Sequence, residues 1–321
     1  MDLSAFREFA ELALHKSYTT AAQSLNLSQP TLSRHIDALE RELNSQLVAD
    51  VLPVRLTPAG DAVLQTALRM SDLFSNLQDE LADMHRTAPA RIRIHDTLTL
   101  RPLLARLAIA ANETARSYPH ATIEYVMPRS GKAPHETIRD GLCDLSFAQV
   151  VENGSGSICE NERSTNAIPL SGTSGRLVFG VPQESSLAEC ADIDLASLRH
   201  EAFFIPAHRS CEPFKNTFVE ACRARGFRPV LKMIPCDRLE DFYLLDHGDG
   251  VHVLSESDFT ANATLMNSLR ARSAFVPLAS DDDLHIRWHA LRRPESDNPA
   301  FERFFALLTE PGNDSDEETA G

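Results

Sequence analysis

The sequence lacks the features that mark membrane, secreted and metal-binding proteins. No apolar run approaches the ~18–20 residues of a membrane span, and no basic stretch followed by an apolar core opens the chain, as a secretory signal would. The six cysteines form no Cys-x-x-Cys pair, which argues against a zinc ribbon or a thioredoxin-like site. We therefore expect a cytoplasmic protein that binds no membrane, no metal and no cofactor.

The chain is also short of positive charge. Its 31 Lys+Arg stand against 46 Asp+Glu, a net charge of −15, and residues 1–88 hold seven against twelve, which leaves −5. Because cations on phosphates supply most non-specific DNA affinity, charge alone does not indicate a nucleic-acid partner. What the chain does have is length: 321 residues with 43% hydrophobic content predict a globular protein of two or three domains.

The first forty residues carry a pattern of short helices. Apolar residues at helical spacing predict one helix over 3–13 and a second, alanine-rich one over 19–25, with a turn at 26–28. A third helix begins at Gln29-Pro30 and turns Leu32, Ile36 and Leu39 inward. Two short helices joined by a tight turn suit insertion into the DNA major groove.

The letters of this segment make the prediction specific. Residues 17–36, SYTTAAQSLNLSQPTLSRHI, followed by Leu39-Glu40 and Leu43, closely resemble the N-terminal signature of LysR-type transcriptional regulators, and so do residues 54–60, VRLTPAG. The resemblance implies an all-α winged helix-turn-helix over 1–60. It also implies that a set of residues lies at the DNA, to which we add His35 and Arg55: Ser28, Gln29, Pro30, Thr31, Ser33 and Arg34.

The side chains of the third helix suit base and phosphate contacts. Gln29 can pair with adenine, Thr31 can contact a thymine methyl, and Arg34 can take guanine or a phosphate. Ser28 and Ser33 suit phosphate oxygens. In an isolated segment, Ser28 would be only a helix cap and Arg34 a solvated side chain.

The wing departs from the family pattern. The family usually has Phe after the position of Leu47 and then a basic wing with Arg, whereas residues 48–53 read VADVLP and carry Asp50. Arg55 is the cation left near this wing. We expect modest DNA affinity per head and strong dependence on oligomerisation, and Asp50→Arg should tighten binding in a salt titration.

A long helix follows, with Thr57 as its cap and Pro58 at its first position. Its apolar residues alternate at spacings of four and three, the heptad pattern of a two-stranded coiled coil. We expect residues 58–88 to link the domains and to form a dimer through Val63, Met70, Phe74, Leu77 and Leu81, with Ala67 and Met84 on the same seam. A dimer predicts an inverted-repeat operator. A helix packed only on its own domain is the alternative.

From Arg91 onward, short apolar strands alternate with helices. Strands are expected near 92–94, 122–126 and 145–150, then at 177–181, 203–205, 231–234 and 251–254; segments 274–278 and 286–291 and a helix at 299–308 return to the first part. This rhythm predicts an open, mainly parallel α/β sheet. Residues 138–145 and 248–251 resemble LysR-type effector domains, which look like periplasmic binding proteins.

That resemblance implies a C-terminal α/β periplasmic-binding-protein-like domain over 91–310. We expect subdomain I at about 91–165 and 269–310, subdomain II at about 166–268, and a disordered acidic tail at 311–321. Ligands of such folds bind where the strand ends of two subdomains meet. By position, the effector cleft should be lined by Thr97, Thr99, Ala207, Arg209, Ser210 and Cys236, and Arg209 would suit a carboxylate effector.

A pair of cysteines and a pair of histidines could indicate redox or metal chemistry. Peroxide-sensing family members carry a reactive cysteine in the loop that holds Cys211 and a resolving one nearby, where Cys222 lies, although the separation differs. A buried, inert thiol is the alternative that we favour. His285 and His289 are four apart, as in a helical metal pair, but their surroundings predict a strand, so we expect no metal.

The sequence thus predicts a DNA-binding transcriptional regulator, not an enzyme, controlled by a small-molecule effector. Its expected partners are double-stranded DNA, the effector, a second copy in a dimer or tetramer, and RNA polymerase. A redox-sensing regulator that uses Cys211 is one alternative. Another is a ligand binder or enzyme of the binding-protein fold that does not act on DNA, although no nucleophile–base pair stands out. A regulator whose DNA head has decayed is a third.

Overall fold

The structure is a computed structural model, and it describes residues 3–49, 54–85, 91–95, 103–127, 131–153, 167–236, 239–244, 246–257, 263–280, 282–294 and 296–310. The chain divides into two compact units. One comprises residues 1–87 with 128–130, and the other comprises 88–127 with 131–321.

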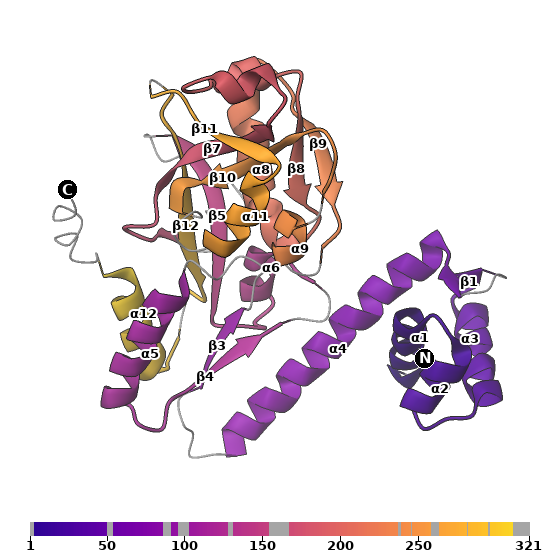
Figure 1. Ribbon diagram of the computed structural model, residues 1–321. Helices are drawn as coiled ribbons and strands as arrows, with labels where there is room; N and C mark the ends of the chain where they lie inside the picture. The colour runs from indigo at the N-terminus through magenta and orange to yellow at the C-terminus, as the bar shows by residue number, and fades with distance from the viewer. Residues whose placement is uncertain are drawn as a thin grey trace. The chain divides into compact units, whose positions relative to one another are not determined.

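The N-terminal unit is a helical bundle with a small hairpin (Figure 1). Its elements are α1 (Leu3–His15), α2 (Tyr18–Ser24), α3 (Gln29–Glu42), β1 (Val48–Ala49), β2 (Arg55–Leu56) and α4 (Pro58–His85). β1 and β2 pair antiparallel, which makes the hairpin the wing of the expected winged helix-turn-helix. The predicted order of helix, helix, turn, helix, wing and long helix is confirmed.

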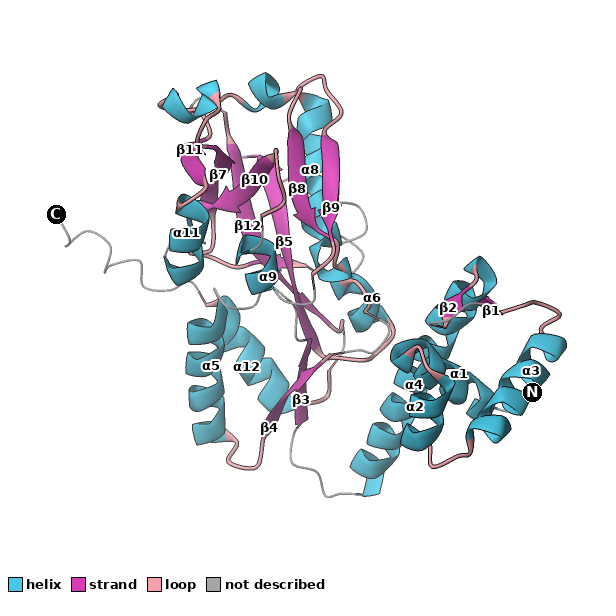
Figure 2. Cartoon of the chain, turned by 45° about the vertical axis from the view of Figure 1, so that its right-hand side comes forward, coloured by secondary structure: helices cyan, strands magenta, loops and turns pink. Residues whose placement is uncertain are grey.

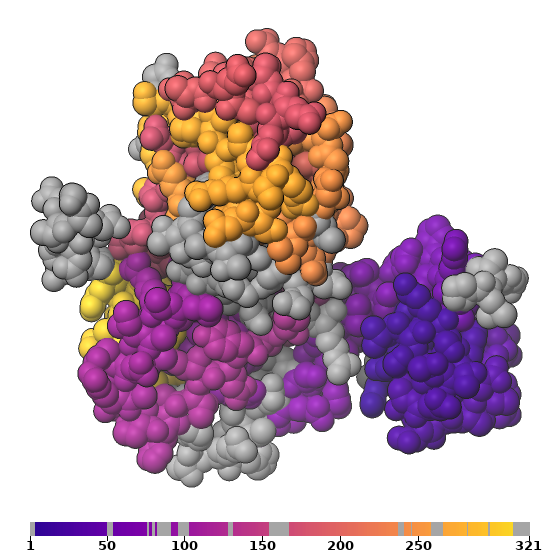
Figure 3. Space-filling model, viewed as in Figure 1, coloured from indigo at the N-terminus to yellow at the C-terminus, as the bar shows by residue number. Residues whose placement is uncertain are grey.

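Local signals explain the helix ends of this unit. The hydroxyl oxygens of Ser17 and Ser28 accept hydrogen bonds from the backbone N–H groups of Thr20 (3.4 Å) and Thr31 (3.3 Å), so each serine caps a helix. Asn26 has a φ of 56° in the turn between α2 and α3, a left-handed conformation that asparagine tolerates well. The indigo residues of these helices pack into one continuous body (Figure 3).

The start of α4 explains the second segment that resembles the family, residues 54–60. The Thr57 hydroxyl accepts from the backbone N–H of Gly60 at 3.0 Å, as a helix cap does. A Cβ at Gly60 would lie 2.1 Å from the carbonyl oxygen of Leu47, so only glycine fits where the helix crosses the chain. Thr57, Pro58 and Gly60 therefore each have a structural task.

The C-terminal unit is built on one long mixed sheet flanked by helices (Figure 2). The strands are β3 (Arg91–His95), β4 (Thr122–Val126), β5 (Leu145–Asn153), β6 (Ile168–Pro169), β7 (Gly175–Pro182), β8 (Ala202–Pro206), β9 (Val230–Ile234), β10 (Val251–Ser255), β11 (Ser273–Pro277) and β12 (Leu284–Arg292). The helices are α5 (Leu104–Ser117), α6 (Pro134–Arg139), α8 (Glu212–Ala224), α9 (Leu239–Leu244), α11 (Ala263–Arg270) and α12 (Pro299–Thr309), with short 3-10 turns η2 (Ser186–Glu189), η3 (Leu195–Leu198) and η4 (Arg209–Cys211).

The strand order is β4-β3-β5-β12-β7-β10-β8-β9, with β11 beside β7 and β6 beside β12. The pairs β3–β4, β3–β5, β8–β9 and β8–β10 are parallel. The central pairs β5–β12, β7–β12, β7–β10 and β7–β11 are antiparallel. The expected mainly parallel sheet is thus mixed, because β7, β11 and β12 run against their neighbours.

The two largest apolar cores of this unit lie in different halves of it. The first core holds Ile92, Ile94 and the α12 phenylalanines, and the second holds Leu177, Phe179 and Phe218. β5 and β12 run through both cores and so belong to both halves. In Figures 1 and 2, α5 and α12 lie side by side on the first half.

One expected boundary is wrong. Residues 274–278 were expected to return to the first subdomain, yet β11 pairs with β7, and Val276 and Leu278 lie in the second core. The reason lies in the strand pairing: β7 pairs with β10 along one edge and with β11 along the other. The chain therefore completes the sheet of the second half before it returns to the first half. The return is made by β12, as expected for 286–291, and by α12.

No helix in the described part of the chain combines the length and apolar character that a membrane crossing requires.

Candidate functional site

The polar face of α3 is the first candidate site. Leu32, Ile36 and Leu39 are buried, as expected. The residues expected at DNA lie on the remaining surface: Ser28, Gln29, Pro30, Arg34 and His35 are exposed, and Thr31 and Ser33 are half-buried. One helix face thus gathers amide, hydroxyl and guanidinium groups, which are the groups that read base edges and phosphates.

Hydrogen bonds within this face hold it in order. The hydroxyls of Ser28 and Thr31 share a hydrogen bond of 2.7 Å. Arg34 donates through Nε to the Pro30 carbonyl (3.3 Å) and through Nη2 to the Thr31 hydroxyl (3.5 Å). Arg34 therefore folds back over the first turn of its helix, and Ser28 is a cap as well as a candidate phosphate ligand.

His35 has a structural partner. Its Nδ1 lies 2.7 Å from the carboxylate of Glu8 on α1, and Glu8 is nearly buried while the His35 side chain is 45% exposed. This contact joins α3 to α1. His35 thus holds α3 in place against α1, which weakens its case as a base-reading residue.

Glu40, which belongs to the segment that resembles the family signature, ties α3 to the wing. One of its carboxylate oxygens accepts hydrogen bonds from the backbone N–H groups of Leu47 (2.6 Å) and Val48 (3.0 Å). These bonds tie the last turn of α3 to the first strand of the wing. The charge faces backbone donors and so does not simply oppose phosphate.

The wing presents Arg55. This residue is exposed on β2, opposite Ala49 on β1, in the position of the expected wing cation. Asp50 and its neighbours up to Pro53 lie outside the described residues. The expected effect of Asp50 on DNA affinity therefore stays a prediction.

The predicted dimer seam divides into two parts along α4. Val63 and Met70 pack against the unit's own core, and Ala67 is buried in it. Farther along, Phe74, Leu77 and Leu81 are exposed at 57%, 49% and 46%, and Leu73, which the heptad pattern did not include, is exposed at 52%. A stripe of four large apolar side chains thus lies open in the second half of the helix, which we call the α4 stripe.

The second candidate site lies in the C-terminal unit, where its two halves meet. His95, at the end of β3, is buried and hydrogen-bonds through Nδ1 with the hydroxyls of Ser146 on β5 (2.9 Å) and Thr137 on α6 (3.2 Å). Burial, with a smaller effect from His208, lowers the pKa of His95 to about 4. His95 is therefore neutral near pH 7. Sequence reasoning missed this cluster, whose members are far apart along the chain.

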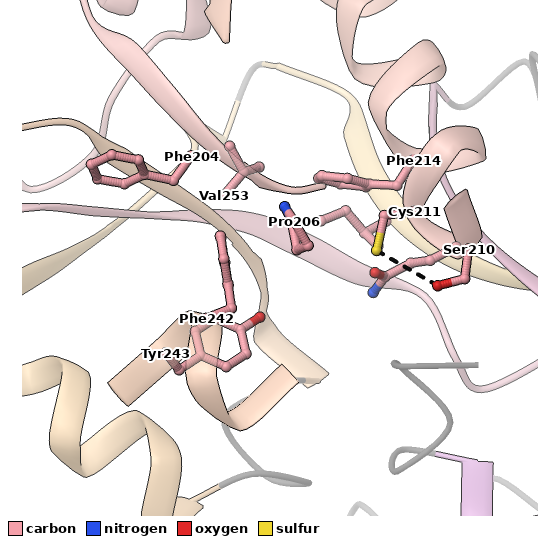
Figure 4. Close-up of a pocket in the computed structure, with 10 residues that line it drawn as sticks. Phe204, Pro206, Ser210, Cys211, Phe214, Phe242, Tyr243 and Val253 are labelled. Carbon is pink, nitrogen blue, oxygen red and sulfur yellow. Dashed lines mark hydrogen bonds between the residues drawn. The ribbon is translucent and has the colours of Figure 1, made fainter. Parts of the chain in front are cut away.

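A small pocket adjoins the η4 loop (Figure 4). Its volume is about 30 Å³, room for about two waters. Its walls are mostly apolar and aromatic with a few polar groups, and they comprise Gln149, Phe204, Pro206, Ser210, Cys211, Phe214, Phe242, Tyr243, Val253 and Ile286. In Figure 4, Ser210 and Cys211 face each other across a hydrogen bond, while Phe242 and Tyr243 lie below Pro206. We call this space the η4 pocket.

The predicted effector residues fall in different places. Ser210 lines the η4 pocket and is buried, with its hydroxyl 2.7 Å from Nδ1 of His208. Arg209 is paired with Glu136 of α6 (3.0 Å) and Glu212 (3.3 Å), so two carboxylates already meet its guanidinium.

The other predicted effector residues that the structure describes do not line the η4 pocket. Ala207 is exposed, and Cys236 packs on another apolar cluster. Thr97 and Thr99 lie outside the described residues. Gln149 and Tyr243 were not foreseen.

Cys211 and Cys222 are both buried. Burial raises the pKa of each thiol to about 12. Since the thiolate is the reactive form, neither residue has the environment of a peroxide-sensing cysteine. The inert alternative is favoured.

His285 and His289 lie on strand β12, as expected from their surroundings. Positions four apart on a strand are separated by about 13 Å, too far to share a metal ion. Within the described residues, no group of three or more His, Cys, Asp or Glu side chains is placed to hold a metal.

Known proteins resemble both units. Residues 3–61 match the family model described as bacterial regulatory helix-turn-helix protein, lysR family. The probable cat1 operon transcriptional activator of Acinetobacter lwoffii is 28% identical over 180 residues, which cover 53% of this chain and 56% of that protein. The chain thus spans little more than half the length of that relative. The uncharacterized HTH-type transcriptional regulator YnfL of Escherichia coli (strain K12) is 23% identical over 95% of this chain and 96% of its own.

A solved structure shares the whole fold. CbnR, a LysR family transcriptional regulator, aligns with 96% of this chain and 98% of its own at a TM-score of 0.53 and 18% identity. Full-length CbnR in complex with its target DNA aligns with a TM-score of 0.52, at 19% identity and over 96% and 99% of the two chains. The expected fold class, a winged helix-turn-helix with a long helix and a two-part α/β domain, is confirmed.

Proposed function

We propose that this chain is a member of the LysR family of bacterial helix-turn-helix regulators, whose family model residues 3–61 match, and a sequence-specific transcriptional regulator whose DNA binding responds to a small-molecule effector. The observation that carries the proposal is the α3 face, where the matched segment presents its polar side chains outward while its apolar ones are buried. The relatives are named as regulators and activators, in keeping with a protein that is not an enzyme.

In this proposal, α3 enters the major groove of double-stranded DNA. Gln29, Thr31 and Arg34 read bases, and Ser28 and Ser33 contact phosphates. Pro30 starts the helix so that its first turn approaches the DNA, and Arg55 grips the backbone from the wing. His35 acts through Glu8 by orienting the helix.

The α4 stripe supports the proposed dimer. Leu73, Phe74, Leu77 and Leu81 are large apolar side chains that this chain alone leaves in water. Burying such a stripe against a second copy stabilises a dimer, at about 25 cal/mol for each Å² removed from water. Val63 and Met70 would contribute by bracing the helix against its own domain. Two paired heads fit an inverted-repeat operator.

The effector is proposed to enter between the two halves of the C-terminal unit, beside His95, His208 and Ser210. The η4 pocket holds only about 30 Å³, so an effector must open it. Because β5 and β12 cross both halves, such an opening bends these two strands, and Arg209–Glu136 separates when the halves part. Ser210, Gln149 and Tyr243 would then orient the ligand, with Thr97 and Thr99 as further candidates.

Further partners belong to the same proposal. A tetramer, contact with RNA polymerase and a cytoplasmic location are expected of a regulator of this family. The redox alternative that uses Cys211 has the raised pKa of its thiol against it.

The test is saturable DNA binding. Fluorescence anisotropy with the DNA upstream of the protein's own gene should give binding that resists excess non-specific competitor, and Gln29→Ala should weaken it. A thermal-shift screen of small carboxylates and aromatics identifies the effector, which should then change the DNA affinity of the full chain. Binding that the competitor abolishes would favour a binding-protein-fold ligand binder or a regulator with a decayed head.

A further inference from the structure

A second cavity lies in the second half of the C-terminal unit, apart from the η4 pocket. Its volume is about 210 Å³, about seven times that of the η4 pocket. Its lining includes His252 on β10, Arg272 after α11, and His247 and Gly248 in the loop before β10. The wall that the two spaces share is the ring of Phe204. We call this space the β10 cavity.

His252 is the unusual residue of this cavity. It is 5% exposed, and its Nδ1 has no hydrogen-bond partner among the described residues. Leaving a buried polar atom unpaired is unfavourable, and a ligand that supplies the missing hydrogen bond removes that cost. Aromatic rings surround it, with centroid distances of 4.9 Å to Phe204 and 5.3 Å to Phe242. The ring is therefore fixed in orientation.

The backbone makes room for this arrangement. A Cβ at Gly250 would lie 2.5 Å from the Phe204 ring, so glycine allows the ring to close one wall of the cavity. Around Gly248, where φ is 76°, a Cβ would meet nothing within 4 Å. The cavity is thus walled by packed aromatic groups on one side and open at the loop on the other.

The charges near His252 favour an anion. Burial, His247 and Arg272 lower the pKa of His252 to about 3, so its ring is neutral near pH 7 and carries one N–H. Arg272 donates one of its guanidinium N–H groups to the carbonyl of Tyr243 at 2.8 Å. A guanidinium has five donors, so it can also bind a carboxylate.

Two carboxylates also line the cavity, and their setting limits their effect on an anion. Asp246 and Asp249 are both exposed, so water screens them. Asp246 accepts the backbone N–H of Gly248 at 2.9 Å, which directs it to its own loop. The backbone carbonyl of Asp249 is met by Lys232, which adds a cation beside the ring of Phe204.

We propose that the β10 cavity is a second ligand site that binds a small organic carboxylate with an apolar body. Arg272 and His252 hold the carboxylate, and Phe204 and Leu269 pack against the body. The site goes beyond the proposed function, since it lies apart from the η4 pocket and needs no DNA.

The test uses the full chain with isotope-labelled histidine and phenylacetate as the probe. Titration should shift the ring signals of His252 in a saturable way, and phenylacetamide, which has the same shape without the charge, should bind at least about tenfold more weakly. If neither phenylacetate nor cyclohexanecarboxylate shifts the His252 signals at millimolar concentration, the proposal is overturned.

Variants separate a site from a bystander. His252→Phe replaces the imidazole with another aromatic ring, and Arg272→Met replaces the arginine with an unbranched apolar side chain. Each variant should bind phenylacetate at least about tenfold more weakly in calorimetry. The circular dichroism of each variant should match that of the parent. His285→Phe, the same change at an exposed histidine of β12, should leave binding unchanged. Equal affinity of His252→Phe and the parent contradicts the proposal. If the parent protein binds phenylacetate but does not bind DNA, the proposed regulator function is contradicted and the proposal for the β10 cavity is not.

Discussion

The carboxylate of Glu40 lies 2.6 Å from the backbone nitrogen of Leu47, and the same oxygen accepts from Val48 at 3.0 Å. One side chain thus joins the last turn of α3 to the start of the wing. Since the wing carries only Arg55 among its described cations, its position relative to α3 matters more than its charge.

Replacing Glu40 should therefore harm both stability and DNA binding. Glu40→Ala leaves two backbone N–H groups without their acceptor, and we expect a loss of about 1–3 kcal/mol in the free energy of unfolding. Chemical denaturation and DNA anisotropy measure the two effects. Asp37→Ala, at an exposed position one turn earlier on α3, is the control and should change unfolding by less than about 0.5 kcal/mol. Equal effects of both variants would remove the anchoring role of Glu40.

Arg34 should contribute specificity. Arg34→Ala removes a guanidinium that the Pro30 carbonyl and Thr31 hold over the start of α3, and we expect about ten- to hundredfold weaker binding to the operator. Arg7→Ala, at an exposed site on α1, controls for the lost charge. If both variants weaken specific and non-specific DNA equally, Arg34 meets only the general field of the phosphates.

The α4 stripe should control assembly. Leu77→Glu places a charge where we propose that two copies meet, and it should shift the protein to a smaller species in light scattering. Gln78→Glu adds the same charge at the exposed neighbouring position and should leave the mass unchanged. A Leu77→Glu protein that keeps the parent's mass would show that another surface joins the copies.

Cys211 should react slowly. Because burial raises its pKa to about 12, almost none of the Cys211 thiol is ionised at pH 7. Mass spectrometry after brief alkylation or mild peroxide should find the exposed Cys190 modified well before Cys211. Faster modification of Cys211 would revive the redox-sensing alternative.

His95 should make stability depend on pH. Its pKa is about 4 in the folded chain and near 6.5 when unfolded, so the unfolded chain binds the proton more readily between these values. Stability is full above pH 6.5 and falls, as pH drops toward 4, by up to about 1.4 kcal/mol per pH unit from this group.

His95→Gln should flatten that slope, measured by denaturation at several pH values between 6.5 and 4. His285→Gln, at an exposed histidine, should keep the parent's slope. An unchanged slope in His95→Gln would mean that the buried ring is not what couples folding to protons.

Local chemistry explains what the sequence predicted well. Helix caps and close backbone approaches depend on residues near in sequence or on one crossing segment, so the residue types alone predict them. The examples here are Ser28, Thr57, Pro58 and Gly60. Strand and helix positions in the C-terminal unit followed from apolar periodicity, and the structure has them within a few residues.

What the sequence did not predict depends on distant contacts. His95, Thr137 and Ser146 meet only because β3, α6 and β5 pack together. Arg209 looked free for a ligand until Glu136, seventy-three positions earlier, proved to lie 3.0 Å away. An apolar stripe on a helix likewise reads the same whether it faces its own domain, as Val63 does, or stands open, as Phe74 does.

The pairing of β5 with β12 also sets an order on synthesis. Leu145 is opposite Arg292, so neither half of the C-terminal unit is complete until Arg292 has been made. The elements of the N-terminal unit, by contrast, are all present once α4 has been made. At about 5–20 residues per second, the ribosome needs roughly 10–40 s between these points. We expect each new molecule to pass through an interval in which it can hold DNA before it can sense anything.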